Sequence, residues 1–242
     1  MSEFAVILPA AGKSSRFQGF HRKKPFVELN GRAVWLRTVD HFVNRSDVAE
    51  VVLVLAAEDI DEFRERFGAN LAMMNIRLCE GGASRAESVR NGLKALRSDA
   101  AYVAVHDAAR PLIAEPWITE VFTAARTHGA AIPGLSVSST VKQLHSDRTI
   151  ARTVDRTNLV LAQTPQVFRR SLLLDAYSAA VDPELFTDEA SLIEAHGGSV
   201  YVCEGWPINI KITTADDFRM AESLLNILPA GAGLERPGLM DL

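Results

Sequence analysis

Apolar runs rich in β-branched residues alternate along this chain with segments of helical periodicity. Six of the runs have the length and composition of strands: FAVILP, EVVLVL, NIRLC, AYVAVHD, AAIPGL and SVYVCE. Strands that alternate with helices are typical of βαβ units, whose crossover helices cover both faces of a parallel sheet. The alternation therefore predicts an α/β fold with a Rossmann-like, mainly parallel twisted sheet flanked by helices.

Local signals mark the ends of three predicted helices. Ser84 and Glu87 have the spacing of a capping box at the start of one helix. Pro116 suits the first turn of a second helix, which Gly129 would end. Thr187 is a candidate N-cap for a third helix, because acidic residues follow it directly and are favourable in a first turn.

Residues 136–157 break this alternation. They are polar and β-branched, with the turn signal His145-Ser146-Asp147-Arg148 near their middle, so they predict a two-stranded β-arm that protrudes from the sheet. An isolated hairpin is only marginally stable in water. We therefore expect this arm to contact a second copy of the chain in a homodimer.

Length and composition favour one compact unit. The chain has 242 residues, of which 48% are hydrophobic and 23% charged, as in ordinary globular proteins. We expect a single domain over residues 1–228. Residues 229–242 hold three glycines and two prolines without a usable period, so they predict a flexible C-terminal tail.

The charge and hydropathy patterns argue against several classes of function. A net charge of −4 disfavours a general nucleic-acid surface, which relies on clustered Lys and Arg. No apolar run approaches the roughly 20 residues that span a bilayer, and the N-terminus, with Glu3, fits a secretory signal poorly. Cys79 and Cys203 form no CxxC pair. We expect a cytoplasmic protein without nucleic-acid or membrane partners.

A small, basic turn, Gly12-Lys13-Ser14, follows the first predicted strand. A Walker A loop would need a glycine where Ile7 stands, and a dinucleotide fingerprint would need glycines at Ser14 and Phe17. Small residues still let backbone N–H groups approach phosphates, and five of the 26 Lys and Arg lie between residues 13 and 24. On the turn alone, a tight connection with solvated basic residues remains the alternative.

Motifs spread over most of the chain carry a family resemblance. The run PAAGKSSRF, followed by Lys24-Pro25-Phe26, resembles the PAAGxGxRM…PKQY signature of sugar and polyol phosphate nucleotidyltransferases. Further motifs follow in order: GGASRAESV (81–89), VHDAARP (105–111), TVDR (153–156), QTPQ (163–166), TDEAS (187–191) and NIK (209–211). Together they resemble the 2-C-methyl-D-erythritol 4-phosphate cytidylyltransferase family of non-mevalonate isoprenoid biosynthesis, over about residues 5–225.

The resemblance implies a magnesium-dependent enzyme. In the implied reaction, the phosphate of a sugar alcohol attacks the α-phosphorus of CTP and pyrophosphate leaves, so positioning and electrostatic stabilisation carry most of the catalysis. Ribitol 5-phosphate or another polyol phosphate is the alternative acceptor, because nucleotide motifs do not distinguish acceptors. An alternative of a different class is a nucleotide-binding sensor without chemistry.

The resemblance also implies the site residues. The catalytic cations would be Arg16, Lys24 and Lys211. CTP would bind at Pro9, Ala10, Ala11, Gly12, Gly82, Ser88, Asp107 and Ala108, and Asp107 would also hold magnesium. The sugar-alcohol phosphate would contact Arg110, Thr140, Arg156, Thr164 and Thr187, with Arg156 supplied by the arm of the neighbouring subunit.

The residues themselves give partial support to these roles. Asp107 ends a predicted strand, where ligands of open α/β sheets bind, although a helix N-cap or a loop hydrogen bond is the alternative. Lys211 lies in the strand-like run Ile208 to Thr213, where an idle ammonium would be costly. His106 receives no catalytic role, because the attacking phosphate is already ionised. The sequence departs from the family pattern at Ser14, Ser15 and Pro25.

Overall fold

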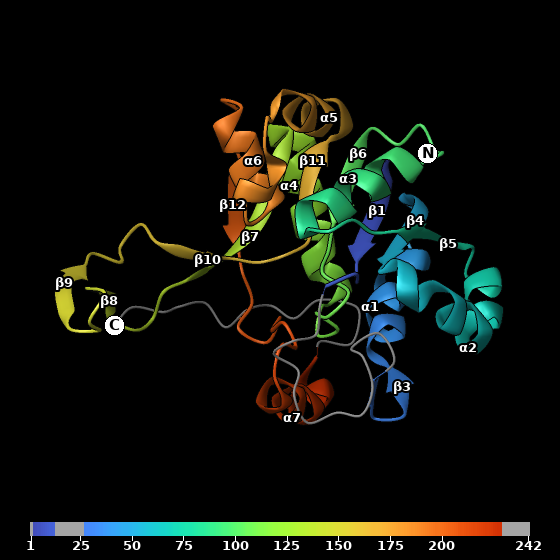
Figure 1. Ribbon diagram of the computed structural model, residues 1–242, viewed down its shortest axis with the longest axis horizontal. Helices are drawn as coiled ribbons and strands as arrows, with labels where there is room; N and C mark the ends of the chain where they lie inside the picture. The colour runs from blue at the N-terminus through green and yellow to red at the C-terminus, as the bar shows by residue number, and fades with distance from the viewer. Residues whose placement is uncertain (1, 13–26, 229–242) are drawn as a thin grey trace.

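The computed structural model describes residues 2–12 and 27–228, and an eight-stranded sheet forms its centre (Figure 1). Four parallel strands make one half of the sheet, in the spatial order β5, β4, β1, β6. Their bounds are β1 Phe4–Pro9, β4 Val48–Leu55, β5 Ile76–Glu80 and β6 Tyr102–Val105. Since the first strand lies between its successors, this half is wound in both directions, as in Rossmann-like folds.

The other half of the sheet is mixed. It contains β7 (Ala130–Ser136), β10 (Val160–Ala162), β11 (Gln166–Arg169) and β12 (Tyr201–Glu204). β11 pairs antiparallel with both β6 and β7, β10 pairs antiparallel with β7, and β12 runs parallel to β7. The α/β class and the mainly parallel sheet are confirmed, with β10 and β11 as antiparallel members.

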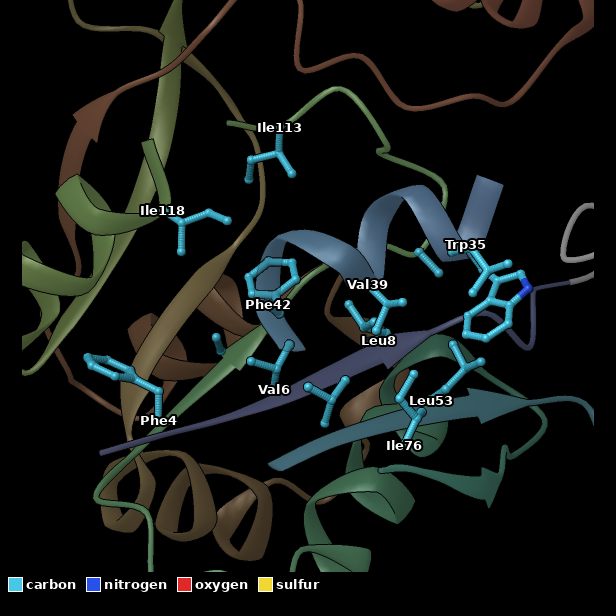
Figure 2. Packing of buried hydrophobic residues seen from close by; sticks show 14 of the residues in the cluster. Phe4, Val6, Leu8, Trp35, Val39, Phe42, Leu53, Ile76, Ile113 and Ile118 are labelled. Atoms are coloured by element: carbon cyan, nitrogen blue, oxygen red, sulfur yellow. The ribbon is translucent and has the colours of Figure 1, made fainter. Parts of the chain in front are cut away.

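Helices cover both faces of the sheet. One face carries α1 (Val34–Val43), α2 (Ile60–Met73) and α4 (Glu115–His128); the other carries α3 (Arg85–Ala95), α5 (Arg170–Ala179) and α6 (Glu189–Ala195). Because alternate strand residues point to opposite faces, β1 serves both cores. Val6 and Leu8 pack toward α1 (Figure 2), whereas Phe4 stacks on Phe122 of α4 with 3.9 Å between the ring centroids. Ala5 and Ile7 belong to the core on the other face.

A third apolar cluster fixes the segment that carries Lys211. Helix α7 (Ala215–Leu224) and the short strand β2 (Glu28–Leu29), which pairs with β3 (Arg32–Ala33), contribute to this cluster, and Ile212 is buried in it. The Ile212 N–H donates to the Ala109 carbonyl at 2.8 Å. The predicted strand over residues 208–213 is wrong, because this segment is irregular and pairs with the loop after β6 instead of with a strand.

The β-arm is confirmed, with shorter strands than its predicted range. β8 (Val141–Leu144) and β9 (Ile150–Val154) form a separate two-stranded antiparallel sheet, which projects from the body beside β7 and β10 (Figure 1). Its cross-strand pair Leu144 and Ile150 is exposed at 49% and 60%. An apolar pair left in solvent agrees with an arm that needs a partner surface.

The helix ends test three predicted caps. Ser84 caps α3 by accepting from the Glu87 N–H at 3.1 Å, but the Glu87 carboxylate accepts from the Ala83 N–H, so the predicted capping box is only half formed. Gly129 ends α4 in the left-handed conformation, as predicted. Thr187 as the cap of α6 is wrong, because the Asp188 carboxylate accepts from the Ser191 N–H at 3.0 Å.

Three short 3₁₀ turns complete the described elements: η2 (Ala57–Asp59), η3 (Pro183–Leu185) and η4 (Leu225–Ile227). Over residues 2–12 and 27–228, none of the helices combines the length and apolarity that a bilayer crossing requires.

Candidate active site

A buried carboxylate with three cationic neighbours lies beyond the carboxyl end of β6. Asp107 is 6% exposed, and its Oδ2 is 2.9 Å from Lys211 Nζ and 3.3 Å from Arg110 Nε. On the other oxygen, Oδ1, Arg85 Nε approaches to 3.6 Å. The loop after β6, the segment before α7 and the start of α3 thus converge on one side chain.

The cations control the ionisation of Asp107. Burial alone would raise the pKa of Asp107, but Lys211, and then Arg85 and Arg110, outweigh burial and hold the pKa well below its usual range. Arg85 also pairs with buried Glu189, so three cations face two carboxylates and the group keeps one excess positive charge. A site with an excess of positive charge attracts anions.

A buried hydrogen-bond network holds the backbone of Asp107. The Thr164 hydroxyl accepts from the Asp107 N–H at 3.2 Å and contacts His106 Nδ1 at 3.0 Å. His106 Nε2 lies 3.1 Å from the Arg110 carbonyl, and burial lowers the pKa of His106 to about 4, so this imidazole is neutral at pH 7. Asn209 donates from Nδ2 to the Thr164 carbonyl.

Thr164 is a central member of this network. Thr164 is 5% exposed, and its hydroxyl is engaged by Asp107 and His106 inside the protein. The sequence predicted that Thr164 binds the acceptor. In the structure its hydroxyl holds the backbone of Asp107, and a contact of Thr164 with the acceptor stays a prediction.

The loops predicted to read the cytosine meet at the ends of β1 and β5. The Gly81 N–H donates to the Leu55 carbonyl at 2.7 Å, which extends the sheet pairing into the loop. A Cβ on Gly81 would lie 2.6 Å from the Cβ of Ala11, so the two loops are in direct contact. Ser88 Oγ accepts from the Gly82 N–H at 3.1 Å and fixes the turn that presents this glycine.

The remaining predicted CTP residues of the body lie at the same edge of the sheet. The Ala10 N–H donates to the Val54 carbonyl at 2.7 Å, and the Ala108 N–H donates to the Pro9 carbonyl at 3.4 Å. Gly12 follows them and is exposed. The structure therefore brings together Pro9, Ala10, Ala11, Gly12, Gly82, Ser88, Asp107 and Ala108.

The predicted acceptor residues divide into two groups. Arg110 lies in the cluster around Asp107, and Thr187 is exposed just before α6. Thr140 and Arg156 are exposed at the base of the arm, beside the paired residues Val141 and Val154, and outside the cluster. Arg16 and Lys24, the other two predicted cations, lie outside the described residues.

Comparison with known proteins identifies the family of this chain. Residues 4–227 match the family model described as "IspD: 2-C-methyl-D-erythritol 4-phosphate cytidylyltransferase". The chain belongs to this cytidylyltransferase family. Relatives with that name in Rhodopirellula baltica and Symbiobacterium thermophilum are 39% and 42% identical, covering 92% and 91% of this chain and 94% and 92% of their own.

Solved structures agree with the family assignment. A 4-diphosphocytidyl-2C-methyl-D-erythritol synthase from Anaerococcus prevotii superimposes with a TM-score of 0.78 at 30% identity, over 92% of this chain and 96% of that one. The 2-C-methyl-D-erythritol 4-phosphate cytidylyltransferase from Thermus thermophilus gives a TM-score of 0.71 at 31% identity, over 93% and 98%.

Two residues of this cytidylyltransferase site were not assigned a role from sequence. Arg85 and Glu189 form a two-pronged ion pair at 2.8 and 3.0 Å, and Glu189 is 1% exposed. Both residues lie inside motifs quoted for the family, GGASRAESV and TDEAS. Each also lies in the first turn of a helix, where an exposed charge is common, so the sequence alone gave no signal that they meet.

The donor set can be tested for magnesium. Among the residues that the structure describes, no group of three or more His, Cys, Asp or Glu side chains could hold a metal ion. Mg²⁺ in nucleotide sites takes one or two carboxylates and completes its shell with phosphates and water. Asp107 fits that pattern, because one of its oxygens is only loosely engaged. Arg85 Nε lies 3.6 Å from Oδ1, whereas Lys211 Nζ lies 2.9 Å from Oδ2. These residues fit a magnesium ion that arrives with a nucleotide, and they do not form a complete metal site by themselves.

Proposed function

We propose that this chain joins CTP and 2-C-methyl-D-erythritol 4-phosphate to give 4-diphosphocytidyl-2-C-methyl-D-erythritol and pyrophosphate, a step of non-mevalonate isoprenoid biosynthesis. Family membership over residues 4–227 supports the assignment. The observation that carries it is the convergence of Arg85, Arg110 and Lys211 on Asp107 at the carboxyl ends of the parallel strands.

The cluster suits a reaction between two polyanions. The acceptor phosphate must approach the α-phosphate of CTP against Coulomb repulsion, so fixed cations lower the barrier most effectively. Asp107 holds Lys211 and Arg110 in place and is itself kept ionised by them. The reaction needs no base, because the attacking phosphate is ionised, and His106 is buried and neutral. Arg16 and Lys24 are proposed to stabilise the charge that develops on the α-phosphate.

Magnesium is part of this proposal. A bound Mg²⁺ would neutralise phosphate charge and orient the triphosphate, with Asp107 as its protein ligand. Arg110 and Thr187 are proposed to orient the acceptor. Arg156 and Thr140 would serve the active site of a second subunit in a homodimer, and the enzyme would work in the cytoplasm.

The test is pyrophosphate release with each of CTP, UTP, ATP and GTP against a panel of sugar and polyol phosphates. We expect release with CTP and 2-C-methyl-D-erythritol 4-phosphate, and at least about tenfold lower kcat/KM with ribitol 5-phosphate. Higher kcat/KM with ribitol 5-phosphate would reassign the acceptor. If no pair of nucleotide and acceptor releases pyrophosphate, the enzyme proposal is wrong and the nucleotide-binding sensor becomes the better interpretation.

Metal removal tests the magnesium proposal separately. In the same assay, excess EDTA should abolish pyrophosphate release, and added Mg²⁺ should restore it. Asp107→Asn should raise the Mg²⁺ concentration needed for half-maximal rate, since an amide is a weaker ligand than a carboxylate for a hard cation. Full turnover in EDTA, or an unchanged Mg²⁺ requirement in Asp107→Asn, would contradict the assignment.

A further inference from the structure

Arg85 links two carboxylates that belong to different parts of the site. Its guanidinium donates to both oxygens of Glu189 at 2.8 and 3.0 Å, while its Nε lies 3.6 Å from Asp107 Oδ1. Tyr177, on α5, donates from its hydroxyl to Glu189 Oε1 at 3.2 Å. Glu189 is therefore fully enclosed, and Arg85 is left with one contact that faces the active site.

The pair joins the nucleotide side of the site to the acceptor side. Arg85 is the first residue of α3, directly after the Gly81-Gly82 loop and the Ser84 cap. Glu189 is the first residue of α6, two positions after Thr187. The Arg85–Glu189 pair is thus a direct side-chain connection between the loop predicted to read cytosine and the turn predicted to bind the acceptor.

The start of α6 has a second attachment to the site. Gln166 Nε2 donates to Asp188 Oδ2 at 2.7 Å, and the Ala190 N–H donates to Gln166 Oε1 at 3.0 Å. Gln166 lies at the start of β11, two residues after Thr164, which orients Asp107. The two residues that follow Thr187 are therefore held by Gln166, which is close in sequence to Thr164, and by Arg85, which contacts Asp107.

A purely structural ion pair would not need this arrangement. Replacing a buried ion pair by uncharged residues of similar volume is often neutral for stability, so stability alone is a weak reason for burying Glu189. The additional approach of Arg85 to Asp107 has a direct consequence for the site. A ligand that displaces the Asp107 carboxylate would also displace Arg85 and, through the Arg85–Glu189 pair, the first turn of α6.

We infer that Arg85 is a positioning residue that couples nucleotide binding to acceptor binding. A triphosphate and its cation that engage Asp107 would fix Arg85, and the Arg85–Glu189 pair would then hold Thr187 in the orientation that receives the acceptor. The coupling is reciprocal, so a bound acceptor would tighten nucleotide binding by the same factor. This inference rests on the proposed function.

Three variants separate positioning from stability. Arg85→Met leaves Glu189 as an unpaired buried charge and should lower Tm by about 10 °C. The double variant Arg85→Met/Glu189→Gln removes both charges while the amide oxygen still accepts from Tyr177, so it should recover most of that Tm. Its kcat/KM for the acceptor should remain about 10- to 100-fold below wild type, because the contact with Asp107 is still missing. Arg85→Lys keeps a charge near Asp107 and should give an intermediate rate.

The coupling itself is measured without turnover. Affinity for the acceptor is determined by calorimetry with and without α,β-methylene-CTP and Mg²⁺, an analogue that cannot release pyrophosphate. Wild type should bind the acceptor at least about fivefold more tightly with the analogue present. In the double variant this ratio should fall to near one.

A matched control pair lies at the opposite end of β1. Arg126 Nε is 2.7 Å from Glu3 Oε2, so Arg126→Met also breaks an ion pair but should leave both the rate and the coupling ratio unchanged. Recovery of rate together with Tm in the double variant, or a coupling ratio equal to that of wild type, would overturn the inference. Failure of the proposed function is distinct, because wild type would then release no pyrophosphate in the same assay.

Discussion

Gly81 has no room for a side chain at the point where the two nucleotide loops meet. An added Cβ would lie 2.6 Å from Ala11 Cβ and 2.9 Å from Ser88 Oγ, so Gly81→Ala must push the loops apart. We expect Gly81→Ala to destabilise the fold by about 1–3 kcal/mol in urea unfolding and to raise KM for CTP. Gly68→Ala is the control, because nothing lies within 4 Å of that position in α2, and it should stabilise by about 0.5–1 kcal/mol. An unchanged KM in Gly81→Ala would show that these loops do not shape the nucleotide site.

Cys203 is a buried thiol whose chemistry can be predicted at the same scale. Burial, and then the charge of Glu120, raises the pKa of Cys203 to about 11, so at a given pH less thiolate is present than in an ordinary cysteine. In a Cys79→Ser background, the rate of iodoacetamide alkylation at pH 8 should be about a hundredfold lower than for a free thiol. The rate should climb about tenfold per pH unit up to pH 9.5. A plateau below pH 9 would contradict the raised pKa.

Some residues of the site could be predicted one at a time and others could not. Asp107 was predictable because a carboxylate at the end of a buried strand lies where α/β sheets bind ligands. Lys211 was predictable because a lysine in an apolar run needs a partner, although that run proved irregular. Arg85 and Glu189 were not predictable, since 104 positions separate them and only the fold brings them together.

At the scale of elements, two neighbouring residues before α6 have different predicted roles: Asp188 stabilises the helix as its cap, and Thr187 is predicted to bind the acceptor. The Asp188 carboxylate accepts from the Ser191 N–H and from Gln166 Nε2, so Asp188→Ala should cost about 1–2 kcal/mol in urea unfolding. Thr187→Ala should change stability by less than about 0.5 kcal/mol while raising KM for the acceptor. Equal destabilisation by the two substitutions would mean that Thr187 shares the capping role.

The predicted elements succeeded where periodicity decides and failed where tertiary contacts decide. The run FAVILP matches β1 from Phe4 to Pro9, because a strand buried on both faces is apolar throughout. Residues 208–213 also look like a strand, yet their partner is the loop after β6, and a sequence gives no information about that partner. Thr and Asp are both good N-cap residues, so the sequence does not decide between Thr187 and Asp188. The backbone angles decide it, and they place the cap at Asp188.

At the scale of the whole molecule, the arm is the part whose sequence is easiest to interpret and whose partner is hardest to predict. Polar alternation around a turn indicates a hairpin, and β8 and β9 form one. The arm projects from the body (Figure 1), and the exposed pair Leu144 and Ile150 lies on it. We proposed that this hairpin contacts another copy of the chain, and no local sequence pattern identifies the surface that it would contact.

Mixed dimers test whether the active site is shared between subunits. Arg156→Ala should inactivate the site of the partner, whereas Lys211→Ala should inactivate the site of its own subunit. In a heterodimer of these two variants, one site combines an intact Lys211 with an intact Arg156, and the other site lacks both. Each variant alone should be nearly inactive, but an equimolar mixture that exchanges subunits at random should recover about a quarter of wild-type pyrophosphate release.

The control is a mixture in which both subunits carry Lys211→Ala, which should gain no activity. If the Arg156 and Lys211 variants also gain nothing after subunit exchange has been verified by native mass spectrometry, each subunit must complete its own site and the arm must serve another purpose.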